Sequence, residues 1–232
     1  MRRRLVLFDI DGTLISDGGA ARAAFADALR TVFHYDGDLR RYDFSGRTDP
    51  QITTMVLRDA GWSDEAIAVK LEELWPVYLA GLARTATAER VRALPGIPTL
   101  VSALHEHRDV TLALLTGNIE RGARLKLTPP ALNDFFPFGA FGSDSAKREE
   151  LPPIAVERAS QVDGHRFSGA DVVIIGDSIY DVRCGVPHNA MTIAIASGKT
   201  PAETLRAENP THFFKSAEDT GALLEAILSS RA

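Results

Sequence analysis

The sequence has a single cysteine, Cys184, and no long hydrophobic run. One cysteine forms neither an intrachain disulfide nor a thiolate metal site, which fits a reducing compartment and predicts a cytoplasmic protein. The apolar stretch near the N-terminus is interrupted by Asp9 and Asp11, and no segment approaches the roughly 18 apolar residues of a membrane span. We therefore expect neither a disulfide scaffold nor a membrane protein.

The chain also lacks an excess of positive charge. Lys and Arg number 26 against 31 Asp and Glu, so the net charge is −5. A protein that binds nucleic acid generically shows a basic surface, and this balance argues against such a partner. The length of 232 residues and the 45% hydrophobic content suffice for one large domain or a domain with an insertion. Nothing in the sequence indicates an oligomeric state.

The hydrophobic pattern divides the chain into a helical segment and an alternating one. Residues 16–90 contain helical spacing, as in Ala20–Phe33, and no convincing strand. Elsewhere short apolar runs alternate with helices, which is typical of a parallel sheet. The predicted strands are Leu5–Phe8, Val110–Leu115, Phe138–Phe141, Val172–Ile175, Thr192–Ala196 and Thr211–Phe214. We predict an α/β fold: a Rossmann-like parallel sheet core (1–15 and 91–232) with helices on both faces and an inserted α-helical cap (16–90).

Two carboxylates, Asp9 and Asp11, follow the first strand and precede Gly12 and Thr13. An Asp-Gly turn is the ordinary structural explanation. A calcium loop counted from Asp9 would need Glu at its twelfth position, where Ala20 stands, so that explanation fails. Two like charges at the end of a buried strand are costly unless a cation or a substrate uses them.

Polar residues follow two further strands, as Thr116-Gly117-Asn118 and as Asp177 with Asp181. Ligands of open α/β sheets bind outside the carboxyl ends of the strands, so these groups should converge. Carboxylates without nitrogen or sulfur ligands favour Mg²⁺. A divalent cation, a Thr hydroxyl and loop amides near Gly12 and Gly117 are what a phosphate requires.

These segments resemble the motifs of haloacid dehalogenase-like hydrolases. Asp9-Ile10-Asp11-Gly12-Thr13 matches the first motif, Leu114-Leu115-Thr116-Gly117-Asn118 the second, and Ile175-Gly176-Asp177-Ser178-Ile179-Tyr180-Asp181 the fourth. The resemblance covers essentially the whole chain and is greatest to helical-cap phosphatases of the phosphoglycolate phosphatase type. The cap matches by position and helicity only.

The resemblance implies Mg²⁺-dependent hydrolysis of a small phosphorylated metabolite. Asp9 would be the nucleophile and form an aspartyl-phosphate, while Asp11 would act as general acid and then general base. Asp9, the backbone carbonyl of Asp11, and Asp177 would hold the metal, with Asp181 nearby or as an alternate ligand. Thr116 and the amides around Gly117 would bind phosphoryl oxygens. The remaining substrate-binding candidates are Gly12, Thr13, Arg47 and Asn118.

The third motif supplies a cation, and here the sequence departs from the family pattern. The region reads Ser145-Ala146-Lys147-Arg148 before a Pro-rich helix start. Residue type favours Lys147, whereas the spacing of the apolar helix positions favours Arg148. Both remain candidates. Asn118 contacts substrate or caps the next helix, Arg47 reaches the site or is solvated, and Arg121 and Lys126 are expected to face solvent.

Three other functions compete with that of a phosphatase. A dehalogenase has no use for an acid at Asp11, so phosphoryl transfer is favoured. A sugar phosphomutase shares all the motifs, but such mutases tend to carry a His early in the cap, where Ser16-Asp17-Gly18-Gly19 stands. A catalytically silent member that binds a phosphometabolite or a protein has little reason to keep both Asp9 and Asp11. Phosphatase leads, with phosphoglycolate as the family-level substrate.

Overall fold

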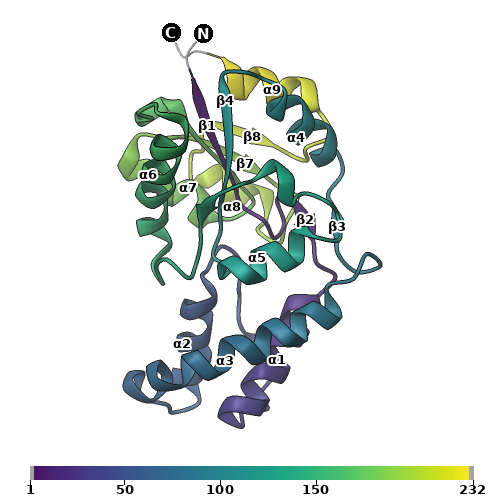
Figure 1. Cartoon of the computed structure of the whole chain (residues 1–232), viewed down its shortest axis with the longest axis vertical. Helices are drawn as coiled ribbons and strands as arrows, with labels where there is room; N and C mark the ends of the chain where they lie inside the picture. The colour runs from purple at the N-terminus through teal and green to yellow at the C-terminus, as the bar shows by residue number, and fades with distance from the viewer. Residues whose placement is uncertain (1–2, 230–232) are drawn as a thin grey trace.

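A six-stranded parallel sheet is the centre of the computed structural model, which describes residues 3–229 (Figure 1). The strand order is β5-β4-β1-β6-β7-β8. The bounds are β1 Arg4–Phe8, β4 Val110–Leu115, β5 Gly139–Ala140, β6 Val172–Gly176, β7 Met191–Ile195 and β8 His212–Phe214. Because β1 pairs in parallel with both β4 and β6, the three strand ends that carry the polar motifs are neighbours.

Both faces of the sheet are covered, which explains why its strands are apolar without a gap. In β1, Val6 and Phe8 pack on one face with residues of α4, α5 and α9. Leu5 and Leu7 pack on the other face with residues of α6 and α7. Alternate side chains of a strand point to opposite faces, so burial on both sides requires a continuous apolar run. The predicted α/β class with helices on both faces is confirmed.

The helices include the predicted one at Ala20–Phe33. Their bounds are α1 Ala20–Phe33, α2 Asp49–Asp59, α3 Asp64–Thr85, α4 Ile97–His105, α5 Glu120–Leu127, α6 Leu151–Asp163, α7 Ile179–Gly185, α8 Ala202–Ala207 and α9 Thr220–Leu228. Side-chain caps mark two starts in the cap segment: Thr48 accepts from Gln51 N, and Ser63 from Ala66 N. Among residues 3–229, no helix combines the length and apolarity needed to cross a membrane.

Helices α1, α2 and α3 form a body of their own beside the sheet (Figure 1). They share a separate hydrophobic cluster that includes Phe25, Leu29, Leu57, Leu74 and Tyr78. A two-stranded antiparallel ribbon, β2 Ile15–Ser16 and β3 Arg92–Ala93, connects this body to the sheet. The division of the chain into core and cap after residues 15 and 90 stays a prediction. The two strands of the ribbon lie next to these boundaries.

Two details differ from the sequence-based expectation. The ribbon was not predicted, because two residues per strand are too few for a periodic pattern. The sequence pattern predicts a helix over Ile154–Gln161 that follows Pro152-Pro153, whereas helix α6 already begins at Leu151. The pair Pro152-Pro153 lies in its first turn, where the missing N–H groups need no partner, so these prolines start the helix instead of preceding it.

Candidate active site

The ends of β1, β4 and β6 open into a cavity of about 420 Å³. Its floor contains the predicted residues Asp9, Asp11, Thr116, Asn118 and Asp177. The cap contributes the opposite wall, which includes Arg22, Phe25, Phe44 and Tyr78. Chain segments separated by more than a hundred residues therefore meet in one concave site between the sheet and the cap, as the convergence of strand ends predicts.

Asp9, Asp177 and Asp181 form a buried acidic cluster. One carboxylate oxygen from each lies within 4.8 Å of the others. Burial, opposed by the Arg148 guanidinium and reinforced by Asp181, raises the pKa of Asp9 to about 7. Burial and the neighbouring carboxylate of Asp9 raise the pKa of Asp177 well above its usual range. The cluster is therefore short of positive charge.

The cation beside Asp9 is Arg148. Its side chain is 4% exposed, and Nη2 lies 3.0 Å from Asp9 Oδ1 and also contacts Asp181 Oδ1. Lys147, in contrast, has 69% of its side chain exposed and pairs with Glu150 at 3.2 Å. Of the two third-motif candidates, only Arg148 reaches the acidic cluster.

Asp181 is occupied by structural contacts. Its Oδ2 accepts hydrogen bonds from Ser178 N and Ser178 Oγ at 2.9 and 2.6 Å. The first of these forms a capping box at the start of α7, together with the bond that Asp181 N donates to Ser178 Oγ at 3.3 Å. Its Oδ1 accepts from Arg148. Asp177 is less engaged, since its one hydrogen bond among the described residues comes from Thr13 Oγ1 to Oδ1 at 3.2 Å. The free acceptor oxygens of the cluster thus belong to Asp9 and Asp177.

The donor set fits Mg²⁺. All three clustered side chains offer hard oxygen ligands, and Arg148 balances only part of their charge. Gly12 keeps room beside Asp177: at φ 85°, an added Cβ would lie 2.5 Å from Asp177 Oδ2. A divalent cation held by Asp9 and Asp177 would satisfy the oxygens that lack partners.

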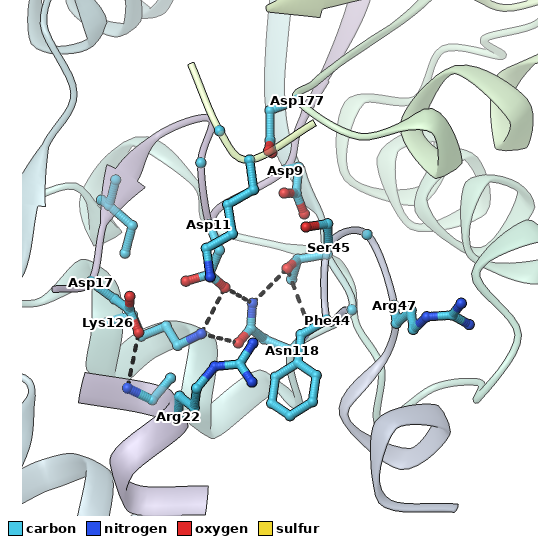
Figure 2. A pocket seen from close by; sticks show the side chains of 18 of the residues that line it. Asp9, Asp11, Asp17, Arg22, Phe44, Ser45, Arg47, Asn118, Lys126 and Asp177 are labelled. Carbon is cyan, nitrogen blue, oxygen red and sulfur yellow. Dashed lines mark hydrogen bonds and ion pairs between the residues drawn. The ribbon is translucent and has the colours of Figure 1, made fainter. Parts of the chain in front are cut away.

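Asp11 belongs to a second network (Figure 2). Its Oδ2 accepts from Lys126 Nζ at 2.6 Å and from Asn118 Nδ2 at 2.7 Å. Lys126 Nζ also donates to Asn118 Oδ1 at 2.5 Å, and Asn118 Nδ2 donates to Thr116 Oγ1 at 2.9 Å. Asn118 therefore contacts Asp11 and Thr116 directly, so it joins the first and second motifs.

The expectation that Lys126 faces solvent is wrong. Lys126 is 3% exposed, whereas Arg121 on the same helix is exposed as expected. Burial alone would lower the pKa of Lys126, but the facing carboxylates of Asp11 and Asp49 outweigh it and raise the pKa above its ordinary value. The spacing of Ala123, Lys126 and Leu127 could have indicated this position, because it places Lys126 on the buried face of α5.

The second-motif loop contacts the cap directly. Asp49 N donates to Gly117 O at 2.7 Å, and Asp49 Oδ2 accepts from Ile119 N at 2.9 Å. An added Cβ on Gly117 would lie 2.1 Å from Arg47 O, so this close approach requires glycine. The backbone of the cap loop thereby fixes the cap over Thr116 and Asn118.

Arg47 lines the cavity, but its guanidinium lies over the Tyr180 ring, 5.2 Å from the centroid. Figure 2 shows the side chain pointing away from Asp9 and Asp11. The predicted substrate contact of Arg47 stays a prediction. The cap cation that sequence reasoning missed is Arg22, whose guanidinium lies 3.9 Å from the centroid of Phe44, a wall of the same cavity.

A parallel sheet with carboxylates at its strand ends beneath a helical cap defines a class of hydrolases, and the comparison with family models agrees. The model of haloacid dehalogenase-like hydrolases matches residues 6–185, and a second HAD-hydrolase-like model matches residues 151–220. The chain belongs to the haloacid dehalogenase-like hydrolase family. The family predicted from the three motifs is confirmed.

Individual relatives lie within the same family. Over 211 residues, 90% of this chain and 75% of the relative, the chain is 24% identical to a phosphoglycolate phosphatase of Pseudomonas fluorescens (strain Pf0-1). The fold is similar to a hydrolase from Pseudomonas syringae, with a TM-score of 0.75, 20% identity and coverage of 98% and 100% of the two chains. It is also similar to a putative β-phosphoglucomutase from Thermotoga maritima, with a TM-score of 0.65, 19% identity and coverage of 97% and 100%.

Proposed function

We propose that this protein is a Mg²⁺-dependent phosphatase that hydrolyses small phosphate monoesters through an aspartyl-phosphate on Asp9. The observation that carries the proposal is that Asp9 and Asp11, at the end of the same strand, have different partners. Asp9 lies with Arg148 and Asp177, whereas Asp11 is held in a separate network by Asn118 and Lys126. Two carboxylates in different surroundings suit two different chemical roles.

Asp9 attacks the phosphorus and releases the alcohol, and Asp11 protonates the departing oxygen. Asp11 then takes a proton from the water that hydrolyses the aspartyl-phosphate. Arg148 orients Asp9 and adds positive charge beside the transferring group. Thr116, which is fully buried at the end of β4, and the Gly117 amide bind phosphoryl oxygens. Lys147 has no role at the site in this proposal.

The metal ligands would be Asp9, Asp177 and the backbone carbonyl of Asp11. When bound, Mg²⁺ supplies positive charge that offsets the repulsion between the Asp9 carboxylate and the phosphate. Asp181 orients Arg148 and caps α7 instead of giving up its hydrogen bonds. In this proposal, Asp177 binds the metal and Asp181 does not, because the oxygens of Asp181 already accept hydrogen bonds from Ser178 and Arg148.

The cavity favours a small substrate, which a cap above the site also requires. Phosphoglycolate is the first ester to test, because the curated relative of Pseudomonas fluorescens is named a phosphoglycolate phosphatase. The buried, single Cys184 agrees with the cytoplasm as the proposed compartment. A mutase would return the phosphoryl group to a sugar, so release of inorganic phosphate separates the two activities.

Removal of the metal is expected to abolish turnover. With p-nitrophenyl phosphate and a panel of small phosphate esters, excess EDTA should lower the rate to background and added Mg²⁺ should restore it. The Asp177→Asn variant should need a higher Mg²⁺ concentration for half-maximal rate, because it loses one of the two carboxylate ligands. Full activity in EDTA, or no phosphate release from any ester with Mg²⁺ present, would rule out the proposed function.

A further inference from the structure

We propose that Lys126 is a positioning residue that holds Asp11 in the orientation needed to protonate the leaving group. The inference rests on the proposed function, because it concerns the general acid of that reaction. Lys126 lies on α5, and 115 residues separate it in sequence from Asp11. It belongs to none of the three motifs that indicate the family.

The contacts restrain one oxygen of Asp11 and leave the other available. Lys126 Nζ and Asn118 Nδ2 both donate to Oδ2, at 2.6 and 2.7 Å. Within residues 3–229, Oδ1 accepts no hydrogen bond. The Asp11 side chain is 39% exposed and lines the cavity. Oδ1 is therefore the oxygen that can carry a proton toward a substrate.

Lys126 lines the cavity, but its ammonium group is engaged by other protein groups. Its side chain is 4% exposed, and its ammonium group is shared between Asp11 Oδ2 and Asn118 Oδ1. The carboxylates of Asp17 and Asp49 also act on it electrostatically. An ammonium surrounded by carboxylates has little attraction left for a substrate anion. Its remaining effect on the reaction passes through Asp11.

In the first step of the reaction, the acid that Lys126 orients is needed only when the leaving group is a poor one. The later hydrolysis of the aspartyl-phosphate, for which Asp11 is the proposed base, is common to all esters. An alkoxide must be protonated as the P–O bond breaks, whereas p-nitrophenolate leaves as a stable anion. General acid catalysis contributes about 10²–10⁴-fold. Loss of Lys126 should therefore slow the formation of the aspartyl-phosphate much more with alkyl phosphates than with p-nitrophenyl phosphate.

The test compares Lys126→Met with the wild type on two substrates, p-nitrophenyl phosphate and the alkyl phosphate that the wild type hydrolyses fastest. We expect kcat/KM to fall at least tenfold further for the alkyl ester, because kcat/KM reports the step in which the alcohol leaves, whereas kcat also includes the hydrolysis step that both esters share. Arg121→Gln, on the exposed face of the same helix, is the matched control and should behave as wild type on both. Circular dichroism and a thermal melt check that Lys126→Met is folded.

If Lys126→Met is less stable than the wild type, a double-mutant cycle with Asp11→Asn separates the loss of positioning from the loss of stability. In the Asp11→Asn background, Lys126→Met should cause no further loss on the alkyl ester, because the group it orients is already gone. Equal losses of kcat/KM on both esters, or a full additional loss in the Asp11→Asn background, would overturn the positioning role. Absence of phosphatase activity in the wild type would instead contradict the proposed function.

Discussion

Replacing Arg148 with methionine is expected to lower kcat/KM by about 10²–10³-fold and to destabilise the fold, whereas Lys147→Met should leave both near wild type. Removal of one charge stabiliser from an acyl-transfer site typically costs that factor. The two residues are adjacent and both cationic, so Lys147→Met is the matched control for Arg148→Met. Their environments alone account for the difference.

The expected stability change follows from burial. Arg148 is 4% exposed and pairs with Asp9 and Asp181, so its removal leaves two buried carboxylates without their cation. Breaking a buried ion pair from one side costs about 3–5 kcal/mol. The side chains of the Lys147–Glu150 pair are both exposed, so solvent screens the pair and its loss should change stability little.

Urea unfolding and steady-state kinetics on p-nitrophenyl phosphate measure both effects. Arg148→Lys should recover part of the activity. Lysine restores the positive charge, but it does not restore the geometry in which Nη2 of Arg148 contacts both Asp9 and Asp181. If Lys147→Met lost activity and Arg148→Met did not, the assignment of the third-motif cation would be reversed.

Asp9→Asn is expected to remove turnover, by about 10⁴-fold or more, without unfolding the protein. The amide is no nucleophile toward phosphorus, and loss of a nucleophile removes the pathway instead of slowing one step. Because the side chain keeps its size at a site that is 5% exposed, the packing around it should persist. Incubation with substrate should give no phosphorylated enzyme, whereas the wild type should give an acid-quenched phosphoryl-enzyme.

When Mg²⁺ is absent, the stability of Asp9→Asn relative to the wild type should increase as the pH rises. The pKa of Asp9 is raised to about 7 from its ordinary value of 3.8, mainly by burial, so the folded state holds this proton more tightly than the unfolded state. The resulting stabilisation is present below the unfolded value and is lost as the pH rises through about 7. Asparagine does not titrate, so Asp9→Asn should gain stability relative to the wild type between pH 5 and 8.

Urea midpoints at pH 5, 6, 7 and 8 in EDTA test this trend. A difference between variant and wild type that stays constant with pH would contradict the raised pKa. Activity of Asp9→Asn near that of the wild type would sink the nucleophile assignment whatever the stability data show.

The sequence predicted those parts of the molecule that depend on local patterns. Continuous apolar runs such as Val110–Leu115 indicated strands covered on both faces, and the structure has that strand at the same residues. Helix α1 was likewise predicted at Ala20–Phe33 from its spacing. Since the strands are parallel, polar residues just after them had to meet at one edge of the sheet. Fold class, family and the convergence of Asp9, Thr116 and Asp177 follow from these patterns.

Side-chain partners distant in sequence could not be predicted in this way. Lys147 and Arg148 differ by one position, and the turn that precedes α6 sets which of them points inward. From sequence alone, Lys126 looks like an ordinary surface lysine, because the carboxylate that balances its charge is distant in sequence. Folding brings Asp11 Oδ2 within 2.6 Å of Lys126 Nζ. Asp181 resembles a metal ligand until its capping contacts with Ser178 are seen. Local sequence thus determined where the carboxylates stand, whereas the cation beside each of them depends on the long-range packing that excludes water and makes unpaired charge costly.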